Sequence, residues 1–115
     1  MERRITDDLH ELTRVLPSQV TERLDTIGNN DELLEIVLDL GRRPAARYIN
    51  EEIELSDQEV TRLELESVAA SIGSFDADNR AGLERTLHRI SAIRNRRGEI
   101  VGLTCRVGRA VYGTI

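Results

Sequence analysis

All sixteen basic side chains of this 115-residue chain are arginines, and the sequence contains no lysine. A Walker A loop places a lysine against the β- and γ-phosphates of a nucleotide, and Schiff-base chemistry requires a primary amine. Neither chemistry is available within these residues. What remains is arginine, a permanently charged fork of donors that suits phosphate and carboxylate groups.

The other side chains that could ligate a metal or act as a nucleophile are scattered along the chain. His10, His88 and Cys105 show no ligand spacing such as CxxC or HxxxH, so the sequence predicts no metal site. No GxSxG elbow is present, and no acid, base and nucleophile can be grouped into a catalytic site. We expect a chain that is not an enzyme, with no catalytic residues and no cofactor of its own.

Charge is divided unevenly between the two parts of the sequence. Residues 1 to 76 hold 8 Arg against 18 Asp and Glu, whereas residues 77 to 115 hold 8 Arg against 3 acidic residues, within a total net charge of −5. A basic part of this kind can face the acidic part of another subunit or bind phosphates. The plainer alternative is that both parts are solvated surfaces.

Length and composition predict one domain that is not inserted in a membrane. A chain of 115 residues with 39% hydrophobic side chains can close a single modest core. No apolar run approaches the length of a membrane-spanning helix. The single cysteine excludes an internal disulfide, which is consistent with a reducing compartment.

The first thirty residues predict two short amphipathic helices. Thr6 and the two aspartates after it are typical of a helix start, and apolar residues at helical spacing run from Ile5 to Leu16. Pro17 suits the first turn of a second helix, which Gly28 would end.

Strands and a third helix are predicted next. Residues 34 to 40 alternate as a half-buried strand, with one face formed by Leu34, Ile36, Leu38 and Leu40. A returning strand is expected over 45 to 49 and a short one over 51 to 55. Ser56 and Glu59 have the spacing of a capping box, which predicts a helix over 57 to 72. Its apolar positions would be Val60, Leu63, Leu65, Val68, Ala69 and Ile72.

A loop and a hairpin complete the predicted fold. Residues 74 to 82 are expected to form a loop, followed by a strand from about Leu83 or Leu87 to Arg94, a turn over 95 to 99 and a strand over 100 to 107. The order of elements predicts an α+β fold, an antiparallel sheet with helices packed on one face. We expect a helical lead-in over 1–30, a body over 31–107 and an edge strand or linker over 108–115.

Two segments resemble known protein families. Residues 79 to 115, NRAGLERTLHRISAIRNRRGEIVGLTCRVGRAVYGTI, resemble the segment just ahead of the P-loop in a family of ring-forming, AAA-type ATPases. This family comprises cyanobacterial and chloroplast P-loop ATPases with a C-terminal single-stranded-nucleic-acid domain of the Arg-x-x-x-His type, and stage III sporulation protein AA is a more distant relative. The phrase LEIVLDLGRRPAARY also resembles the opening of the PAS-like N-terminal domain of type II and type IV secretion ATPases and pilus-retraction motors.

The resemblance implies a non-catalytic, PAS-like assembly and regulatory domain of a P-loop ring ATPase. Its partners would be the ATPase core of the same protein, which binds ATP and magnesium, and neighbouring subunits, in the bacterial cytoplasm or the chloroplast stroma. Arginines of the hairpin would reach nucleotide phosphates at subunit boundaries. The candidates are Arg85, Arg89, Arg94 and Arg106 on the hairpin strands, with Arg80 on the preceding loop.

Two alternatives from other functional classes stay open. The first is a nucleic-acid-binding module, for which Arg94, Arg96 and Arg97 would form a phosphate-binding patch. Such binding should be weak and salt-dependent, because the chain is acidic overall and its basic strands lack interleaved aromatic residues. The second is an adaptor that binds a protein partner through a sheet edge or its acidic helices.

Overall fold

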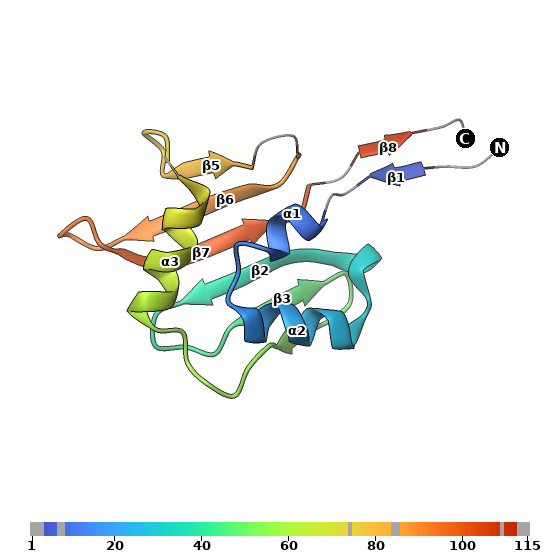
Figure 1. The fold of residues 1–115 in the computed structure, drawn as a ribbon, viewed down its shortest axis with the longest axis horizontal. Coiled ribbons are helices and arrows are strands. Elements are labelled where there is room, and N and C mark those ends of the chain that lie inside the picture. Colours follow the sequence, from blue (N-terminus) through green and yellow to red (C-terminus); the bar gives the residue numbers. More distant parts are fainter. Residues whose placement is uncertain (1–3, 7–8, 74, 84–85, 109, 113–115) are drawn as a thin grey trace.

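A six-stranded antiparallel sheet, with three α-helices on one face, forms the body of the protein (Figure 1). The computed structural model describes residues 4–6, 9–73, 75–83, 86–108 and 110–112. The described elements are β1 (Arg4–Thr6), α1 (Leu9–Thr13), α2 (Ser18–Ile27), the 3-10 helix η1 (Asn30–Glu32), β2 (Leu33–Asp39), β3 (Ala45–Tyr48), β4 (Glu52–Glu54), α3 (Arg62–Ile72), β5 (Arg80–Gly82), β6 (Arg89–Arg94), β7 (Ile100–Arg106) and β8 (Ala110–Tyr112).

Strands β2 and β7 lie at the centre of the sheet, whose strand order is β4-β3-β2-β7-β6-β5. Their register pairs Ile36 with Cys105 and Leu38 with Leu103. These four side chains point to the helix-covered face and are almost fully buried, at 0 or 1% exposure. The opposite face, which we call the open face, carries the polar side chains that alternate with them.

The helices bury their apolar sides against this central pair. Pro17 directly precedes α2, and Gly28, in the left-handed conformation at φ 71°, ends it by donating its N–H to the Leu24 carbonyl. Val20 and Leu24 of α2 pack in the same core as Leu65 and Val68 of α3, in agreement with the helical spacing of the sequence. The predicted α+β class, with helices on one face of an antiparallel sheet, is confirmed. The PAS-like assignment and the division at residues 30 and 107 stay predictions.

The prediction that the third helix begins at residue 57 is wrong. The helix begins at Arg62, and its capping box is formed by Thr61 and Glu64, not by Ser56 and Glu59. The residues before it are used elsewhere, because Val60 makes a bridge with Leu40 and its N–H donates to the Arg42 carbonyl at 2.7 Å. Two Ser/Thr-x-x-Glu patterns occur in succession, and the backbone bonds of the first segment decide between them.

Two apolar positions also differ from the prediction. A bulge between Leu33 and Glu35 places Leu33 in the core and leaves Leu34 39% exposed. Leu63 is 78% exposed, because it lies two residues before the buried Leu65 and therefore on the opposite side of α3. It lines a shallow apolar groove of about 210 Å³ with Val15 and Val68.

Two short segments form strands that the sequence did not predict, and a third confirms a predicted alternative. Arg4–Thr6 is the strand β1 and not the start of a helix, because it pairs with β8 in a separate two-stranded sheet (Figure 1). The edge-strand alternative for residues 108 to 115 is therefore confirmed for Ala110–Tyr112. Arg80–Gly82, expected in a loop, is the strand β5 because it pairs with β6. Strand β6 begins at Arg89, later than the predicted Leu83 or Leu87.

Gly108 marks the place where the chain leaves the sheet. A Cβ atom at this position would collide with the carbonyl group of Leu87, so only glycine fits. The Gly108 N–H donates to Nδ1 of the buried His88 at 3.0 Å. His88, directly before β6, thus has a structural role in holding the segment that follows β7.

Replacement of a central leucine tests the register of the core. We expect Leu103→Ala to lower the free energy of unfolding by about 2–5 kcal/mol, because it removes a fully buried side chain from between the sheet and α3. Leu63→Ala, at an exposed leucine, is the matched control and should change stability by less than about 0.5 kcal/mol. Urea unfolding of both variants measures the difference; equal losses would mean that the buried face is wrongly assigned.

Candidate functional site

The acidic and basic parts of the sequence form different halves of the sheet. Strands β4, β3 and β2 come from the acidic part of the chain, and β7, β6 and β5 come from the basic part. The two halves meet at the β2–β7 pairing. The open face therefore has an acidic half and a basic half.

The basic half of the open face carries three arginines with two hydroxyl side chains between them. Arg89 lies directly opposite Arg106, and Ser91 lies opposite both Thr104 and Arg80. Arg80, Arg89 and Arg106 are exposed, and none of them forms an ion pair within the described residues. We call the surface formed by Arg80, Arg89 and Arg106, together with Ser91 and Thr104, the arginine face.

The Arg89–Arg106 pair is electrostatically unfavourable as it stands. Like charges at directly opposite positions of an antiparallel pair destabilise a sheet. Glu35 of β2 lies opposite Arg106 on the other side of the pair. Its carboxylate forms an ion pair with Arg47 of β3, with an N–O distance of 3.1 Å, and not with Arg106. An anion bound over Arg89 and Arg106 would relieve this repulsion.

The acidic half of the open face is different, because its arginines lie among carboxylates. A hollow of about 380 Å³ is lined by Val37, Asp39, Arg42, Arg43, Ala45, Glu52 and Glu54. Arg43 forms an ion pair with Glu54 at 3.4 Å. Positive charge is thus compensated here and uncompensated on the arginine face.

Arg94 is held by protein groups and differs from the other candidate arginines. Its Nε donates to the Asn79 side chain and one terminal nitrogen donates to the Gly98 carbonyl, each at 2.8 Å. Its guanidinium also lies 5.9 Å from the centre of the Phe75 ring. These contacts give Arg94 a structural role at the base of the β6–β7 turn.

Arg96 and Arg97 occupy the β6–β7 turn itself. Both side chains are exposed, and neither makes an ion pair within the part of the chain that the structure describes. The structure thus divides the predicted arginines into the arginine face, the structural Arg94 and the turn pair. Arg85 lies outside the described residues.

Sequence reasoning missed the residues that organise these arginines. Asn79, Asn95 and Phe75 show no motif, and their contacts depend on β5 lying beside β6. Ser91 and Thr104 could have been found from the strand alternation, because Ser91 shares a face with Arg89 and Thr104 shares a face with Arg106.

No alternative chemistry is assembled around the histidines and the cysteine. Across the described part of the chain, no three His, Cys, Asp or Glu side chains form a group that could hold a metal ion. Cys105 is fully buried, and this burial raises the pKa of its thiol from 9.0 to about 12. The thiol is therefore protonated and unreactive near neutral pH.

Relatives of the chain are known among longer proteins. The chain is 51% identical over 111 residues to the uncharacterized protein ycf45 of Porphyra purpurea, and 45% identical over 109 residues to the protein SEEDLING PLASTID DEVELOPMENT 1 of Arabidopsis thaliana. It is 43% identical over 109 residues to the uncharacterized protein ycf45 of Cyanidium caldarium. The alignments include 95 or 96% of this chain but only 20%, 16% and 32% of those proteins.

The remaining comparisons add little. No protein-family model matches the chain. Among solved structures, part of the Legionella pneumophila ATPase DotB is similar, with 14% identity, a TM-score of 0.48, and 75% of this chain and 27% of that chain covered. A likeness of this size supports no conclusion about function. Within the described residues, no helix has the length and apolar character needed to cross a bilayer.

The homologues agree with the plastid side of the predicted resemblance, since one of them is named for seedling plastid development. The predicted link to stage III sporulation protein AA stays a prediction.

The buried thiol makes the free energy of unfolding depend on pH in the alkaline range. Because the folded-state pKa of Cys105 is raised, its contribution is complete below pH 9, the pKa of the free thiol, and is lost as the pH rises toward 12. We expect the free energy of unfolding to fall by about 1.4 kcal/mol per pH unit in that window because of this group. Urea unfolding between about pH 8 and pH 11 should show a flatter profile for Cys105→Ala than for the native chain. Identical profiles would show that the thiol is not buried in the folded protein.

Proposed function

We propose that this chain is a non-catalytic assembly and regulatory domain of a P-loop ring ATPase. In this proposal the ATPase core of the same protein binds ATP and magnesium, and the arginine face reaches the nucleotide phosphates at a subunit boundary. The proposed location is the chloroplast stroma or the bacterial cytoplasm.

The observation that carries the proposal is the Arg89–Arg106 pair. Two opposed guanidinium groups without a carboxylate partner form a site that gains free energy when a phosphate arrives. Arginine suits this role because it stays charged and offers several donors in a fixed plane. Ser91 and Thr104 supply hydroxyl donors beside the pair.

The comparisons support the proposal in one respect. Nearly the whole chain aligns with a part of each longer relative, as expected for a module that works next to other domains. Because these residues contain no lysine, the P-loop of the proposed ATPase would lie in another part of the protein.

The gene itself tests the first part of the proposal. We expect the reading frame to encode a GxxxxGK[ST] motif shortly after Ile115, as the resemblance of residues 79 to 115 implies. The nucleotide sequence of the locus gives the answer. A stop codon directly after Ile115 would contradict an ATPase core in the same protein.

Variants of the arginine face test its role in hydrolysis. In the ATPase that carries this domain, Arg89→Ala and Arg106→Ala should each lower kcat by about 10- to 1,000-fold, because an arginine at the phosphates neutralises charge that develops in the transition state. Arg43→Ala is the control, since Arg43 lines the hollow in the acidic half of the open face and is paired with Glu54. Steady-state ATPase rates, with circular dichroism to confirm folding, measure the effect. Unchanged rates for both face variants would leave the domain without a role at the nucleotide.

The isolated chain should not bind ATP tightly. Without a P-loop, the arginine face offers side-chain contacts but no backbone cradle for the triphosphate. Calorimetry with ATP and magnesium is expected to give no measurable heat. Sub-micromolar binding would show that this chain itself contains a nucleotide site and would contradict the proposal that the ATPase core binds the nucleotide.

A further inference from the structure

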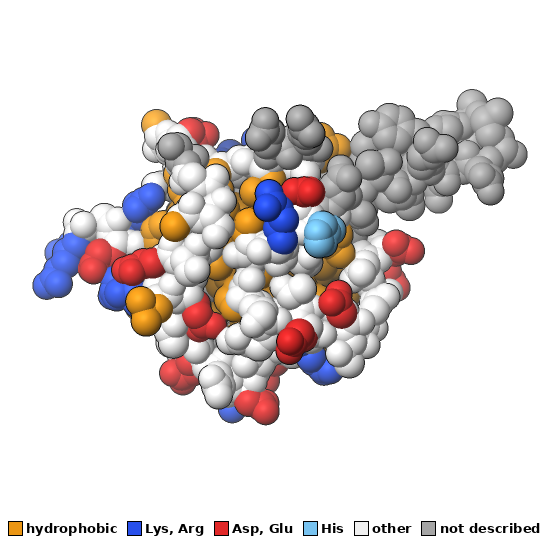
Figure 2. All heavy atoms as spheres, viewed as in Figure 1, with side chains coloured by type: hydrophobic (Ala, Val, Ile, Leu, Met, Phe, Trp, Pro, Cys, Tyr) orange, Lys and Arg blue, Asp and Glu red, His pale blue; other side chains and the backbone are white. Residues whose placement is uncertain are grey.

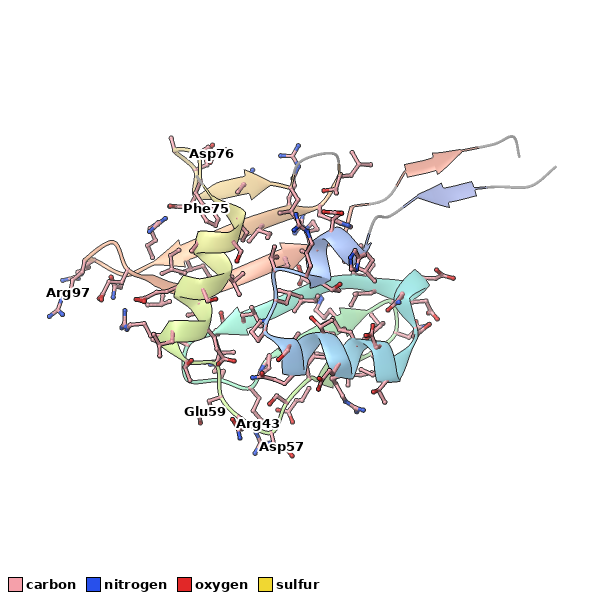
Figure 3. The ribbon with its side chains drawn as sticks, viewed as in Figure 1. Arg43, Asp57, Glu59, Phe75, Asp76 and Arg97 are labelled. Atoms are coloured by element: carbon pink, nitrogen blue, oxygen red, sulfur yellow. The ribbon has the colours of Figure 1, made fainter. Side chains whose placement is uncertain are left out.

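The turn between β6 and β7 is the end of a two-stranded ribbon that extends beyond the rest of the sheet. The backbone contacts of β6 with the β5 side end at Ala92, whose N–H donates to the Asn79 carbonyl, and those of β7 with the β2 side begin at Val101, whose carbonyl accepts from the Leu40 N–H. From Arg94 to Ile100 the ribbon has no further strand beside it among the described residues. Figure 3 shows Arg97 at its far end, pointing away from the body.

We propose that this ribbon end is a docking tip for duplex DNA, in which Arg96 and Arg97 enter a groove and contact the phosphates on its walls. The inference is independent of the proposed ATPase role, which depends on the arginine face.

The turn is preorganised by Asn95. The side-chain oxygen of Asn95 accepts from the backbone N–H groups of Arg97 at 2.9 Å and Glu99 at 3.0 Å. The Asn95 backbone also pairs with Glu99 and Gly98, at 2.9 and 3.0 Å, and Gly98 has the positive φ of 81° that the turn requires. The two arginines thus stand on a fixed backbone, which lowers the entropy lost on binding.

The base of the turn is braced from two sides. On the β5 side, Arg94 binds Asn79 and covers Phe75. On the helix side, Glu99 forms an ion pair with Arg62 of α3 at 2.8 Å. These contacts hold the ribbon in its projecting position relative to the sheet.

The same contacts leave the charge of the tip uncompensated. Glu99 is the only acidic residue in the sequence from Arg94 to Ile100, and its carboxylate already binds Arg62 and the Asn95 side chain. Arg96 and Arg97 therefore present a net positive charge to solvent. Figure 2 shows basic side chains at the outermost left-hand end, with acidic side chains behind them toward the body of the protein.

The shape of the tip favours duplex DNA over other nucleic acids. The major groove of B-form DNA is about 12 Å wide and admits a two-stranded β-ribbon, whereas that of A-form RNA is too narrow for side chains to enter. A single strand is normally held by stacking on aromatic side chains, and the sequence from Arg89 to Arg106 contains none. Two guanidinium groups without base-specific partners imply contacts to phosphate and little sequence preference.

The neighbouring β2–β3 turn provides a matched control. It lies at the same end of the sheet, because Asp39 pairs with Gly102 and the Leu40 N–H donates to the Val101 carbonyl. It also carries two consecutive arginines, Arg42 and Arg43, but these line a hollow with acidic side chains. Both double-alanine variants remove two positive charges from one end of the molecule.

The test is fluorescence anisotropy of this chain with a short labelled DNA duplex over a series of salt concentrations. We expect R96A/R97A to weaken binding at low salt by at least tenfold and to reduce the slope of log K against log salt by about 1.8, since each phosphate contact contributes about 0.9. R42A/R43A should stay within about twofold of the native chain. R96K/R97K should keep most of the slope, because lysine retains the charge.

Asn95→Ala separates positioning from charge. It leaves both arginines in place but frees the turn, so the affinity for the duplex should fall while the salt slope is unchanged. A loss of slope in this variant would show that Asn95 does more than position the turn. Thermal unfolding monitored by circular dichroism keeps global unfolding apart from these effects.

Four results would overturn the proposal. They are no duplex binding at the lowest salt, equal losses for the two double variants, binding of single-stranded DNA or duplex RNA as tight as that of duplex DNA, and dissociation of a self-associated form of the chain by R96A/R97A in sedimentation without an effect on DNA. The last result would assign the tip to a second copy of the chain.

Discussion

The pairing of β2 with β7 is the constraint on which the rest of the structure depends. It joins segments from opposite parts of the sequence, and its buried residues Ile36, Leu38, Leu103 and Cys105 form the surface on which α2 and α3 pack. A shift of β7 by one residue would turn Leu103 and Cys105 to the open face and bring Gly102, Thr104 and Arg106 into the core. Burial of a guanidinium without a partner is costly, so the core chemistry and the charge pattern demand the same register.

That register also separates the charges. Because β2 and β7 are neighbours, the acidic strands lie on one side of the central pair and the basic strands on the other. Ion pairs can form across the acidic half, where Arg43 and Arg47 find glutamates, but the arginines of the basic half have no acidic residue on β5, β6 or β7. Uncompensated positive charge on the open face thus follows from topology and not from an excess of arginine in the chain.

The sequence predicted the elements whose pattern is set locally. The alternation in β2 is confirmed at Ile36 and Leu38, the strand β7 and the turn over 95 to 99 are confirmed, and Gly28 ends α2, which Pro17 directly precedes. The failures share one cause, which is that distant partners decide the outcome. Strand β5 exists through its pairing with β6, β1 through its pairing with β8, and the start of α3 through the contact of Val60 with Leu40.

The candidate sites show the same limit. The sequence identified all the basic residues but could not predict which of them form contacts within the protein. Arg89 and Arg94 lie on the same strand, and no sequence pattern distinguishes them. Register separates them: Arg89 is opposite Arg106, whereas Arg94 is opposite Ile100 and within reach of Asn79.

This sorting has an energetic meaning. The contacts of Arg94 with Asn79 and Gly98 stabilise the fold, whereas the placement of Arg89 opposite Arg106 is electrostatically unfavourable. Arg96 and Arg97 neither stabilise nor destabilise the fold in this way, because they project from a turn that Asn95 and Gly98 already hold. A sheet that keeps two opposed arginines at the expense of stability, and a turn that is rigid around two others, are arrangements that folding alone does not require. Binding of an external anion, which we propose for both sites, would account for both arrangements and for the presence of stabilising and exposed arginines on the same hairpin.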